Sequence, residues 1–351
     1  MKNIKFFLAD LIHNQHDYEY GVPLNIGYIA ATVKEKIKKG IEIRLFKFPD
    51  DLIKAFMEKP DILALSNYDW NVNLNHAIIS MAKKVNPHML IVMGGPNIRK
   101  LNGGIKQFLL NSPDIDIYVV NEGEEGFYNL IEYILGIWPS NIKETIIRKA
   151  ISIPNNAYLA EDRMTLIIGK SCDVSKNDSI PYPSPWLNGL LDPYLDFTNL
   201  LYPLIETNRG CPFQCAYCTW GSFENKNIRK FDIDTVKEEL LYIFKKAKHN
   251  FHFMVCDANF GIFERDIEIA AEIRRLSDRY KKMTGVTIWA SKNNIERNMQ
   301  ISNILGKLSI PDFAVQSFDR RVLKNIGRNN IKLDTIRQFV DTINNNNLHV
   351  N

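Results

Sequence analysis

The sequence predicts an α/β protein in which a doubly wound, Rossmann-like parallel sheet is followed by a partial (β/α) barrel. Short apolar runs alternate with amphipathic stretches in residues 1–138 and again in residues 201–351. The predicted strands are almost continuously apolar, which is typical of parallel strands buried on both faces. Residues 139–200 combine a small predicted hairpin with four prolines between positions 181 and 193, which interrupt regular structure. We therefore expect two domains joined by a connector, with these bounds.

The chain is long enough to bury two hydrophobic cores, since it has 351 residues, of which 45% are hydrophobic and 24% charged. Its 44 basic and 40 acidic residues give a net charge of +4 and are mixed along the sequence. Because there is no long run of one sign, a nucleic-acid partner is disfavoured.

The amino-terminal segment MKNIKFFLADLIHNQHD is predicted to begin with a strand rather than a signal peptide, because Asp10, His13 and Asp17 follow its short apolar run. No apolar stretch approaches the ~18 residues of a membrane-spanning helix. The five cysteines are an odd number, which argues against a disulfide framework and for a reducing compartment. We expect a cytoplasmic protein with no membrane partner.

Five strands and the helices between them are predicted in the first domain. The helices include residues 23–37 and 50–59, and the strands are residues 4–11, 41–48, 61–68, 89–95 and 115–123. Ligands of doubly wound sheets bind beyond the carboxyl ends of the strands. Small and polar residues gather at three of these ends, in the segments Ser66 to Asn71, Gly94 to Asn97 and Asn121 to Glu124. No G-x-G-x-x-G motif follows the first strand, so a dinucleotide site is disfavoured.

The connector and the second domain continue the strand and helix pattern. A hairpin is predicted at residues 153–169. Strands are predicted at 201–208, 251–261, 285–291 and 312–319, and helices at 232–248, 264–282, 294–308, 322–326 and 331–347. Residues 348–351 are predicted to begin a fifth strand.

Three cysteines stand within eight positions in NRGCPFQCAYCTWG, residues 208–221, with the spacing C-x3-C-x2-C. Chance thiols, a zinc site and an iron–sulfur cluster all fit this crowding. Zinc needs four ligands, and only the distant Cys256, or His249 and His252, could add one. An electron-transfer cluster also takes four thiolates, so three would leave one iron open to a ligand from outside the protein. The loop follows the first strand of the predicted barrel, where (β/α) barrels place their chemistry.

This spacing, with the aromatic Tyr217 before the last cysteine and a strand directly before the loop, resembles the radical S-adenosylmethionine superfamily. The resemblance implies a [4Fe–4S] cluster on Cys211, Cys215 and Cys218. It also implies that the amino and carboxylate groups of S-adenosylmethionine chelate the fourth iron, with the backbone near Tyr217 facing the adenine. An electron passed to the sulfonium then cleaves it to methionine and a 5′-deoxyadenosyl radical, while the protein positions the reactants and excludes water.

Other strand ends of the second domain resemble the contacts that this superfamily makes with S-adenosylmethionine. Asp257 and Asn259 are expected to reach the ribose or the methionine part. The further expected contacts are Ser291 at the end of the third strand, Gln316 and Ser317 on the fourth, and Arg328 beyond it. The alternative for each residue is a helix cap or a turn.

The order of the whole chain, a doubly wound domain, the connector PSPWLNGLLD and then the cysteine loop, resembles the cobalamin-dependent (B12-binding) branch of this superfamily. The matching segments are PLNIGYIAA, SNYDWN, VMGGPN and NEGEEGF. The implied cobalamin contacts are Ser66, Tyr68, Trp70, Asn71, Gly94, Gly95, Pro96, Glu122 and Gly123. The D-x-H-x-x-G motif, whose histidine ligates cobalt in many B12 proteins, is absent, so we interpret His13 and His16 as loop residues.

The function that follows from the resemblance is a cobalamin-dependent radical S-adenosylmethionine methyltransferase acting on an unactivated carbon or on phosphorus. A non-methylating relative that performs cyclisation, ring contraction or rearrangement is the alternative within the class. A truncated, non-catalytic cofactor-binding subunit is the alternative outside it. The expected partners are a small-molecule or peptide substrate and an external electron donor of the flavodoxin or ferredoxin type. The superfamily's barrel normally has six βα units, and about four are predicted here. The alternatives are that the chain is a fragment, that a partner polypeptide completes the barrel, or that the lateral opening is used differently. No catalytic residue is assigned beyond the cysteine loop.

Overall fold

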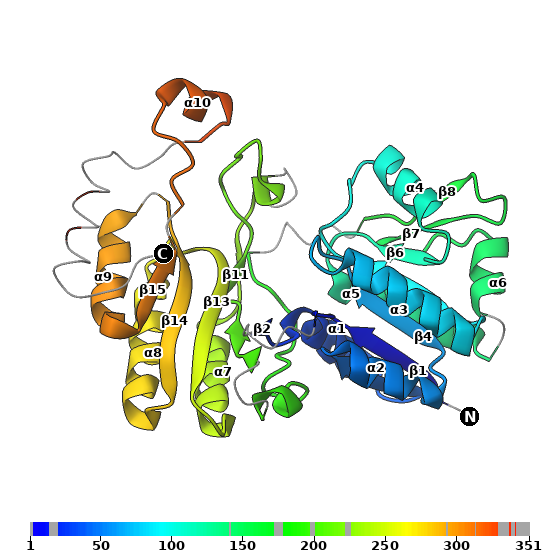
Figure 1. Ribbon diagram of the computed structural model, residues 1–351, viewed down its shortest axis with the longest axis horizontal. Helices are drawn as coiled ribbons and strands as arrows, with labels where there is room; N and C mark the ends of the chain where they lie inside the picture. Colours follow the sequence, from blue (N-terminus) through cyan, green and yellow to red (C-terminus); the bar gives the residue numbers. More distant parts are fainter. Residues whose placement is uncertain are drawn as a thin grey trace. The chain divides into compact units, whose positions relative to one another are not determined.

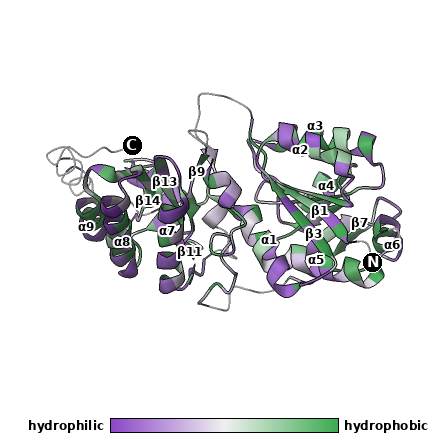
Figure 2. Ribbon diagram, turned by 90° about the horizontal axis from the view of Figure 1, so that it is seen from below, coloured by the Kyte–Doolittle hydropathy of each residue, from purple (hydrophilic) through white to green (hydrophobic). Residues whose placement is uncertain are grey.

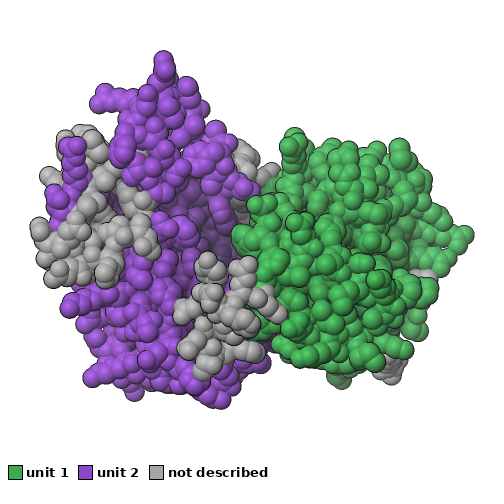
Figure 3. Space-filling model, in the orientation of Figure 1, with its two compact units in different colours: residues 1–18, 23–173 green, residues 19–22, 174–351 purple. Residues whose placement is uncertain are grey.

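The computed structural model describes residues 3–13, 20–139, 142–171, 178–196, 201–221, 226–292, 294–312 and 314–328, together with residues 337 and 341. The chain divides into two compact units (Figure 3). The first unit comprises Met1–Tyr18 and Pro23–Asp173, and the second comprises Glu19–Val22 and Val174–Asn351. Both units are α/β structures with parallel sheets, as the sequence predicts (Figure 1).

The sheet of the first unit has the strand order β3-β1-β4-β5-β6-β7-β8. Its parallel strands are β1 (Ile4–Ala9), β3 (Ile41–Phe46), β4 (Ile62–Ser66), β5 (Leu90–Gly94) and β6 (Ile117–Val119). After β3 the chain returns to the other side of β1, so the direction of strand order reverses between β1 and β4. In doubly wound sheets this reversal opens a crevice for ligands beyond the carboxyl ends of the strands.

The predicted hairpin belongs to this first sheet rather than to the connector. Its strands β7 (Asn156–Leu159) and β8 (Leu166–Ile168) add two antiparallel strands beside β6. The first unit therefore extends to Asp173, well beyond the expected boundary at residue 138. The physical reason is that β6 would otherwise expose its backbone donors and acceptors at a sheet edge, and the hairpin pairs with them.

Helices cover both faces of this sheet (Figure 2). One face packs against α1 (Leu24–Lys36) and α5 (Gly123–Ile137), and the other packs against α2 (Pro49–Ala55), α3 (Val72–Val85) and α4 (Asn102–Asn111). The remaining elements of the unit are the short helices η1 (Phe56–Glu58) and α6 (Ile142–Arg148).

Adjacent residues of β1 supply the two faces of the core, because successive strand side chains point to opposite sides. The Phe6 ring contacts Phe127 of α5 at a centroid distance of 5.5 Å, and the Phe7 ring contacts Phe46 at 4.8 Å. Both β1 rings are fully buried, and full burial of one such side chain contributes about 1.5–3 kcal/mol.

The second unit contains a parallel sheet in the order β10-β13-β14-β15. These strands are β10 (Leu204–Ile205), β13 (Phe251–Phe260), β14 (Met283–Ala290) and β15 (Ser309–Asp312). The helices α7 (Ile233–Lys246), α8 (Arg265–Tyr280) and α9 (Ile295–Leu305) connect them (Figure 1). Over the described residues the sheet is an open part of a barrel. The predicted fifth strand and most of the predicted helix before it lie outside the described residues.

The predicted first strand of this unit is divided into short pieces. They are β9 (Leu201–Tyr202), β10 and β11 (Asn208–Arg209), and Pro203 separates the first two because proline has no N–H to donate to a ladder. β9 pairs with β2 (Tyr20–Gly21), and β11 pairs with β12 (Arg229–Lys230). The connector packs onto the same region, since the fully buried Trp186 donates its ring N–H to the Leu204 carbonyl at 3.0 Å.

The fourth strand was predicted at 312–319, and this position is wrong. β15 occupies Ser309–Asp312, and its Pro311 lies opposite Ile288 of β14. A proline inside an apolar run argues against a central strand, but β15 lies at the edge of the described sheet, where a missing N–H is tolerated. Gln316 and Ser317 consequently lie after the strand, just before the short helix α10 (Arg320–Asn325).

Helix starts in the second unit follow sequence signals. Asp232 accepts a hydrogen bond from the Thr235 N–H at 3.0 Å before α7, and Asn294 accepts one from the Arg297 N–H at 3.1 Å before α9. Such caps satisfy N–H groups that have no partner in the first helical turn. Among the described helices, none has both the length and the apolar composition needed to cross a membrane.

Candidate functional site

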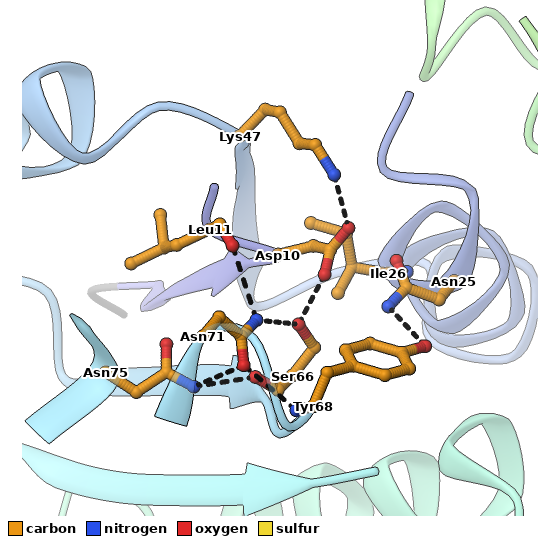
Figure 4. A network of polar contacts seen from close by, with 9 residues as sticks. All are labelled: Asp10, Leu11, Asn25, Ile26, Lys47, Ser66, Tyr68, Asn71 and Asn75. Atoms are coloured by element: carbon orange, nitrogen blue, oxygen red, sulfur yellow. Dashed lines mark hydrogen bonds and ion pairs between the residues drawn. The ribbon is translucent and has the colours of Figure 1, made fainter. Parts of the chain in front are cut away.

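A buried ion pair lies at the carboxyl ends of β1, β3 and β4 in the first unit (Figure 4). The Asp10 carboxylate accepts hydrogen bonds from Lys47 Nζ at 2.7 Å and from Ser66 Oγ at 2.5 Å. All three residues are less than 10% exposed. A buried charge is tolerated when it is paired and hydrogen-bonded, so Lys47 and Ser66 allow Asp10 to remain inside the sheet edge. Asp10 and Lys47 were not among the predicted site residues. They are 37 positions apart in the sequence, and only the pairing of β1 with β3 brings them together.

The segment SNYDWN forms a loop at the same sheet edge, and the Asn71 side chain holds it in place. Asn71 Oδ1 accepts a hydrogen bond from the Tyr68 N–H at 2.9 Å, and Asn71 Nδ2 donates to the Leu11 carbonyl at 3.3 Å (Figure 4). The Trp70 ring stacks on Tyr68 with centroids 4.4 Å apart and planes 9° apart, and Trp70 is 63% exposed. Ser66 and Asn71 therefore hold the loop from inside, while the Trp70 ring stacked on Tyr68 is largely exposed.

Gly95 is a point of very close backbone approach. Its φ angle is +134°, and a Cβ atom there would lie 2.5 Å from the Asn67 carbonyl oxygen. Asn67, which is fully buried, donates to the Asn97 carbonyl at 3.0 Å, and Tyr118 donates to the Gly95 carbonyl at 2.8 Å. The loops after β4 and β5 are thus fastened to each other, and only glycine fits between them.

Replacing Gly95 by alanine is expected to destabilise the protein by about 2 kcal/mol, because alanine is strained at positive φ and its methyl group clashes with Asn67. Urea unfolding followed by circular dichroism measures this loss. Gly103→Ala is the matched control, since no atom lies within 4 Å of its added Cβ. Equal stability of the two variants would contradict the tight fit at Gly95.

The remaining expected cobalamin contacts lie at the same sheet edge. Pro96 is exposed, and Gly94 is partly exposed at the end of β5. Glu122 is the cap residue of α5, and Gly123 is its first residue, packed against Ile29. Contact of all nine residues with cobalamin stays a prediction. His13 lies in a loop, with Nε2 3.1 Å from the Trp70 carbonyl oxygen, and His16 lies outside the described residues.

The cysteine loop of the second unit follows β11. Gly210 has a φ angle of +113°, which is the sharp turn that its sequence position suggests. Cys211 and Cys215 are buried, and Cys218 is partly exposed. The Cys218 N–H donates to the Cys215 carbonyl at 3.0 Å, so the last two cysteines share one tight turn.

Donors point at two of the sulfur atoms. Asn259 Nδ2 lies 3.2 Å from Cys211 Sγ, and Lys292 Nζ lies 3.8 Å from Cys215 Sγ. N–H groups directed at sulfur stabilise the thiolate form, which is the form that ligates iron. Within the described ranges, no three His, Cys, Asp or Glu side chains are arranged around a single metal ion. Cluster thiolates bind separate irons and need no common centre, so the donor set fits a cluster.

Two polar atoms beside this loop are buried without a hydrogen-bond partner in the described part of the chain. They are Asn259 Oδ1 and Ser291 Oγ, and their residues are 2% and 1% exposed. An unpaired buried polar atom is costly unless a ligand or water completes it. Both residues were predicted S-adenosylmethionine contacts, and their unpaired atoms are consistent with a polar ligand at the carboxyl end of the sheet. Their contact with this ligand stays a prediction.

Asp257, another predicted contact, is fully buried and already surrounded by donors. Its carboxylate accepts hydrogen bonds from the Thr207 N–H at 2.7 Å, from the Asn208 N–H at 3.1 Å, from Asn208 Nδ2 at 2.7 Å and from the Thr207 hydroxyl. Burial raises the pKa of Asp257 to about 7, although the hydrogen bonds from Thr207 act to lower it. In the structure Asp257 fixes Thr207 and Asn208, which lead into the cysteine loop. The sequence did not predict this structural role.

A segment beyond the fourth strand holds the cysteine loop from another side. Arg328, which is 5% exposed, donates to the Tyr217 hydroxyl at 2.8 Å and to the Ala314 carbonyl. The Ala216 N–H donates to the Ile326 carbonyl at 2.9 Å. Of the other predicted contacts, Gln316 is exposed, and Ser317 Oγ accepts a hydrogen bond from the Asp319 N–H. A role of Tyr217, Gln316, Ser317 or Arg328 in binding S-adenosylmethionine stays a prediction.

Two family models match the chain, the B12 binding domain over residues 16–131 and the radical SAM superfamily over residues 205–351. Over 307 residues, the chain is 32% identical to the 2-(S-pantetheinyl)-carbapenam-3-carboxylate methyltransferase of Streptantibioticus cattleyicolor, covering 84% of this chain and 42% of that protein. Over 304 residues, it is 30% identical to the cobalamin-dependent radical SAM methyltransferase TokK of Streptomyces tokunonensis, covering 83% of this chain and 41% of that protein. The chain thus spans about two fifths of these relatives.

A solved structure has the same fold. The radical S-adenosylmethionine methyltransferase TsrM from Kitasatospora setae, with cobalamin and a [4Fe–4S] cluster bound, superposes with a TM-score of 0.71 at 12% identity over 99% of this chain and 68% of that chain. The two matched domains account for the three predicted cofactors, cobalamin on the first unit and S-adenosylmethionine with a [4Fe–4S] cluster on the second. Both parts of the predicted architecture are present in the predicted order, and the chain belongs to the cobalamin-binding branch of the radical S-adenosylmethionine enzyme family.

Proposed function

We propose that this chain is the cofactor-binding part of a cobalamin-dependent radical S-adenosylmethionine methyltransferase that methylates an unactivated carbon of a small molecule. The proposal is supported by two curated relatives that are named as methyltransferases and are at least 30% identical to the chain. Both relatives are longer than the chain. Its substrate, its external one-electron donor of the flavodoxin or ferredoxin type, and any polypeptide that completes the barrel are therefore part of the proposal.

The observation that carries the proposal is the cysteine loop with its directed donors. When bound, the cluster and S-adenosylmethionine supply a carbon radical, and cobalamin supplies the methyl group. Cys211, Cys215 and Cys218 hold the iron, while Asn259 and Lys292 stabilise the sulfur charge of the first two cysteines. Asp257 keeps the approach to the loop rigid through Thr207 and Asn208. Rigid placement matters because radical transfer requires the reacting atoms to be close and aligned.

The inner face of the second sheet supports a small-molecule substrate. Residues of β13 and β14 alternate, with Phe253, Val255 and Ile288 buried on one side and Met254 and Trp289 partly or largely exposed on the other. Pockets for small ligands are lined mainly by apolar and aromatic side chains with a few polar groups. We propose that the exposed side, which also carries Thr287, forms part of the substrate wall.

Anaerobic reconstitution of the full chain with iron, sulfide and cobalamin tests the function. With dithionite and S-adenosylmethionine carrying a deuterated methyl group, we expect 5′-deoxyadenosine and S-adenosylhomocysteine, with label transferred to an added substrate. Mass spectrometry measures all three species, and NMR of the product distinguishes methylation of carbon from methylation of phosphorus. Deoxyadenosine alone would indicate non-methylating radical chemistry. Formation of neither nucleoside would contradict catalysis and favour a cofactor-binding subunit.

A further inference from the structure

The three sulfur atoms of the cysteine loop have unequal surroundings. Cys211 receives a neutral amide donor from Asn259 at 3.2 Å, whereas Cys215 lies 3.8 Å from the ammonium group of Lys292. The Tyr217 side chain is also hydrogen-bonded to Cys215. Arg328 in turn donates a hydrogen bond to the Tyr217 hydroxyl. Positive charge is therefore concentrated at Cys215, the middle cysteine of the loop.

Lys292 is held in this position by its backbone and by an aromatic ring. It follows β14 directly, and its neighbour Ser291 is fixed by hydrogen bonds to the Phe260 carbonyl and from Asn298 Nδ2, at 2.8 and 2.7 Å. The Lys292 ammonium lies 5.1 Å from the centre of the Phe213 ring, which belongs to the cysteine loop itself. A cation over an aromatic face is attracted by the ring, so the loop supplies part of the lysine's binding site.

No carboxylate among the described residues neutralises the charge of Lys292. In the described part of the chain, no Asp or Glu oxygen forms an ion pair with its Nζ, while lysines elsewhere in the second unit, such as Lys237 and Lys248, have acidic partners. Lys292 is also only partly exposed, so solvent screens its charge less than that of a surface lysine. A lysine that is partly buried, unpaired and directed at a thiol is placed to act on charge at that sulfur.

The Tyr217 hydroxyl adds to the same effect. The Tyr217 side chain is hydrogen-bonded to Cys215, and its hydroxyl accepts a hydrogen bond from Arg328 Nη1 at 2.8 Å. Arg328 is itself 5% exposed, so solvent screens its charge poorly. Two cations, one direct and one relayed through a hydroxyl, thus act on one sulfur ligand.

We propose that Lys292 is a positioning residue that raises the reduction potential of the cluster by placing a fixed positive charge against Cys215. Reduction adds one electron from an external donor, and the additional negative charge spreads onto the sulfur ligands. Net charge and hydrogen bonds to sulfur are established determinants of cluster potentials. An ammonium at Cys215 stabilises the reduced cluster more than the oxidised one, which makes electron entry easier. The inference relies on the cluster assignment and is independent of whether the product is methylated.

The test is a redox titration of the reconstituted full chain without S-adenosylmethionine, followed by electron paramagnetic resonance. At the wild-type midpoint potential, Lys292→Met is expected to lower the ratio of reduced to oxidised cluster about tenfold, a shift of ~59 mV for one electron. Lys292→Arg keeps the charge and is expected to stay within about threefold of wild type. Lys307→Met is the matched control, because Lys307 is exposed and lies before β15, at the opposite ends of the parallel strands.

Iron and sulfide analysis accompanies each titration, and Lys292→Gln is measured beside Lys292→Met as a second neutral variant. Wild-type potentials in both neutral variants, at full cluster content, would overturn the inference while leaving the proposed function intact. Absence of a four-iron cluster from the wild-type chain would overturn both. Lower potentials in both neutral variants, with a potential near that of wild type in Lys292→Arg, would support the inference.

Discussion

Replacing Cys215 by alanine is expected to reduce 5′-deoxyadenosine formation by at least about 100-fold. Loss of an outer-shell partner of a metal ligand already costs up to about 100-fold, and Cys215 is itself a proposed ligand. The physical reason is that Cys215 is one of only three proposed iron ligands, and it is buried at 3% exposure, where no solvent ligand can replace it. Iron content, sulfide content and visible absorption after anaerobic reconstitution measure cluster loss directly, and chromatography of the quenched reaction measures the nucleoside.

Cys256→Ala is the matched control for this experiment. Cys256 lies in β13 of the same unit, outside the loop, and burial raises the pKa of its thiol so that it remains protonated. A protonated thiol is a poor metal ligand. We therefore expect Cys256→Ala to keep full iron content and deoxyadenosine formation. A variant pattern in which Cys215→Ala retains a complete cluster, or in which Cys256→Ala loses it, would refute the assignment of the three loop cysteines.

Asp257→Ala is expected to lower the free energy of unfolding of the second unit by at least about 3 kcal/mol. The substitution leaves four buried donors of Thr207 and Asn208 without their acceptor, and each orphaned buried group costs about 1–3 kcal/mol. Thermal or urea unfolding measures the change. Asp278→Ala is the control, since Asp278 is an exposed partner of Arg274 at the end of α8 and should change stability by less than about 0.5 kcal/mol.

The same experiment distinguishes the two roles suggested for Asp257. If Asp257→Ala folds as stably as wild type but no longer binds S-adenosylmethionine, the residue is a ligand contact, as the sequence predicts. If the variant loses stability and the cysteine loop becomes accessible to thiol reagents, Asp257 is an anchor of residues 207 and 208. The hydrogen bonds of the structure lead us to expect the second result.

The pH dependence of stability provides a further check on Asp257. Its pKa rises from 3.8 in the unfolded chain to about 7 in the folded protein, so the folded state binds the proton more tightly. The contribution of this group to stability is therefore complete below about pH 4 and declines as the pH rises to about 7. Asp257→Asn cannot titrate, so the wild-type advantage over this variant should shrink between these pH values. An advantage that grows with pH would contradict the raised pKa.

Local sequence signals were sufficient for several features of the protein. The parallel sheets follow from apolar runs alternating with amphipathic stretches, and the cysteine loop follows from its spacing directly after a predicted strand. The helices predicted to start at residues 232 and 294 begin at Ile233 and Ile295, one residue later. These signals are short-range, because a strand run, a turn or a cap depends on neighbours within a few positions.

Other features depended on contacts between distant segments. The hairpin at 153–169 was predicted, but its attachment to β6 was not, because sheet-edge pairing depends on which strand remains open. The fourth strand was misplaced because it contains Pro311, and the sequence does not show that this strand lies at the edge of the described sheet, where proline is tolerated. The Asp10–Lys47 pair and the Lys292–Cys215 contact join residues that are 37 and 77 positions apart in the sequence.

The sequence by itself indicated the kind of chemistry, since three thiols at this spacing after a strand carry the resemblance to the radical S-adenosylmethionine superfamily, and it determined the order of the two domains. Only the tertiary structure decided how those thiols are surrounded: which sulfur meets a cation, which carboxylate is buried under four donors, and which glycine lies against another backbone. The reason is physical. Electrostatic and hydrogen-bond effects act over a few ångströms in space, and folding alone determines which distant residues come that close.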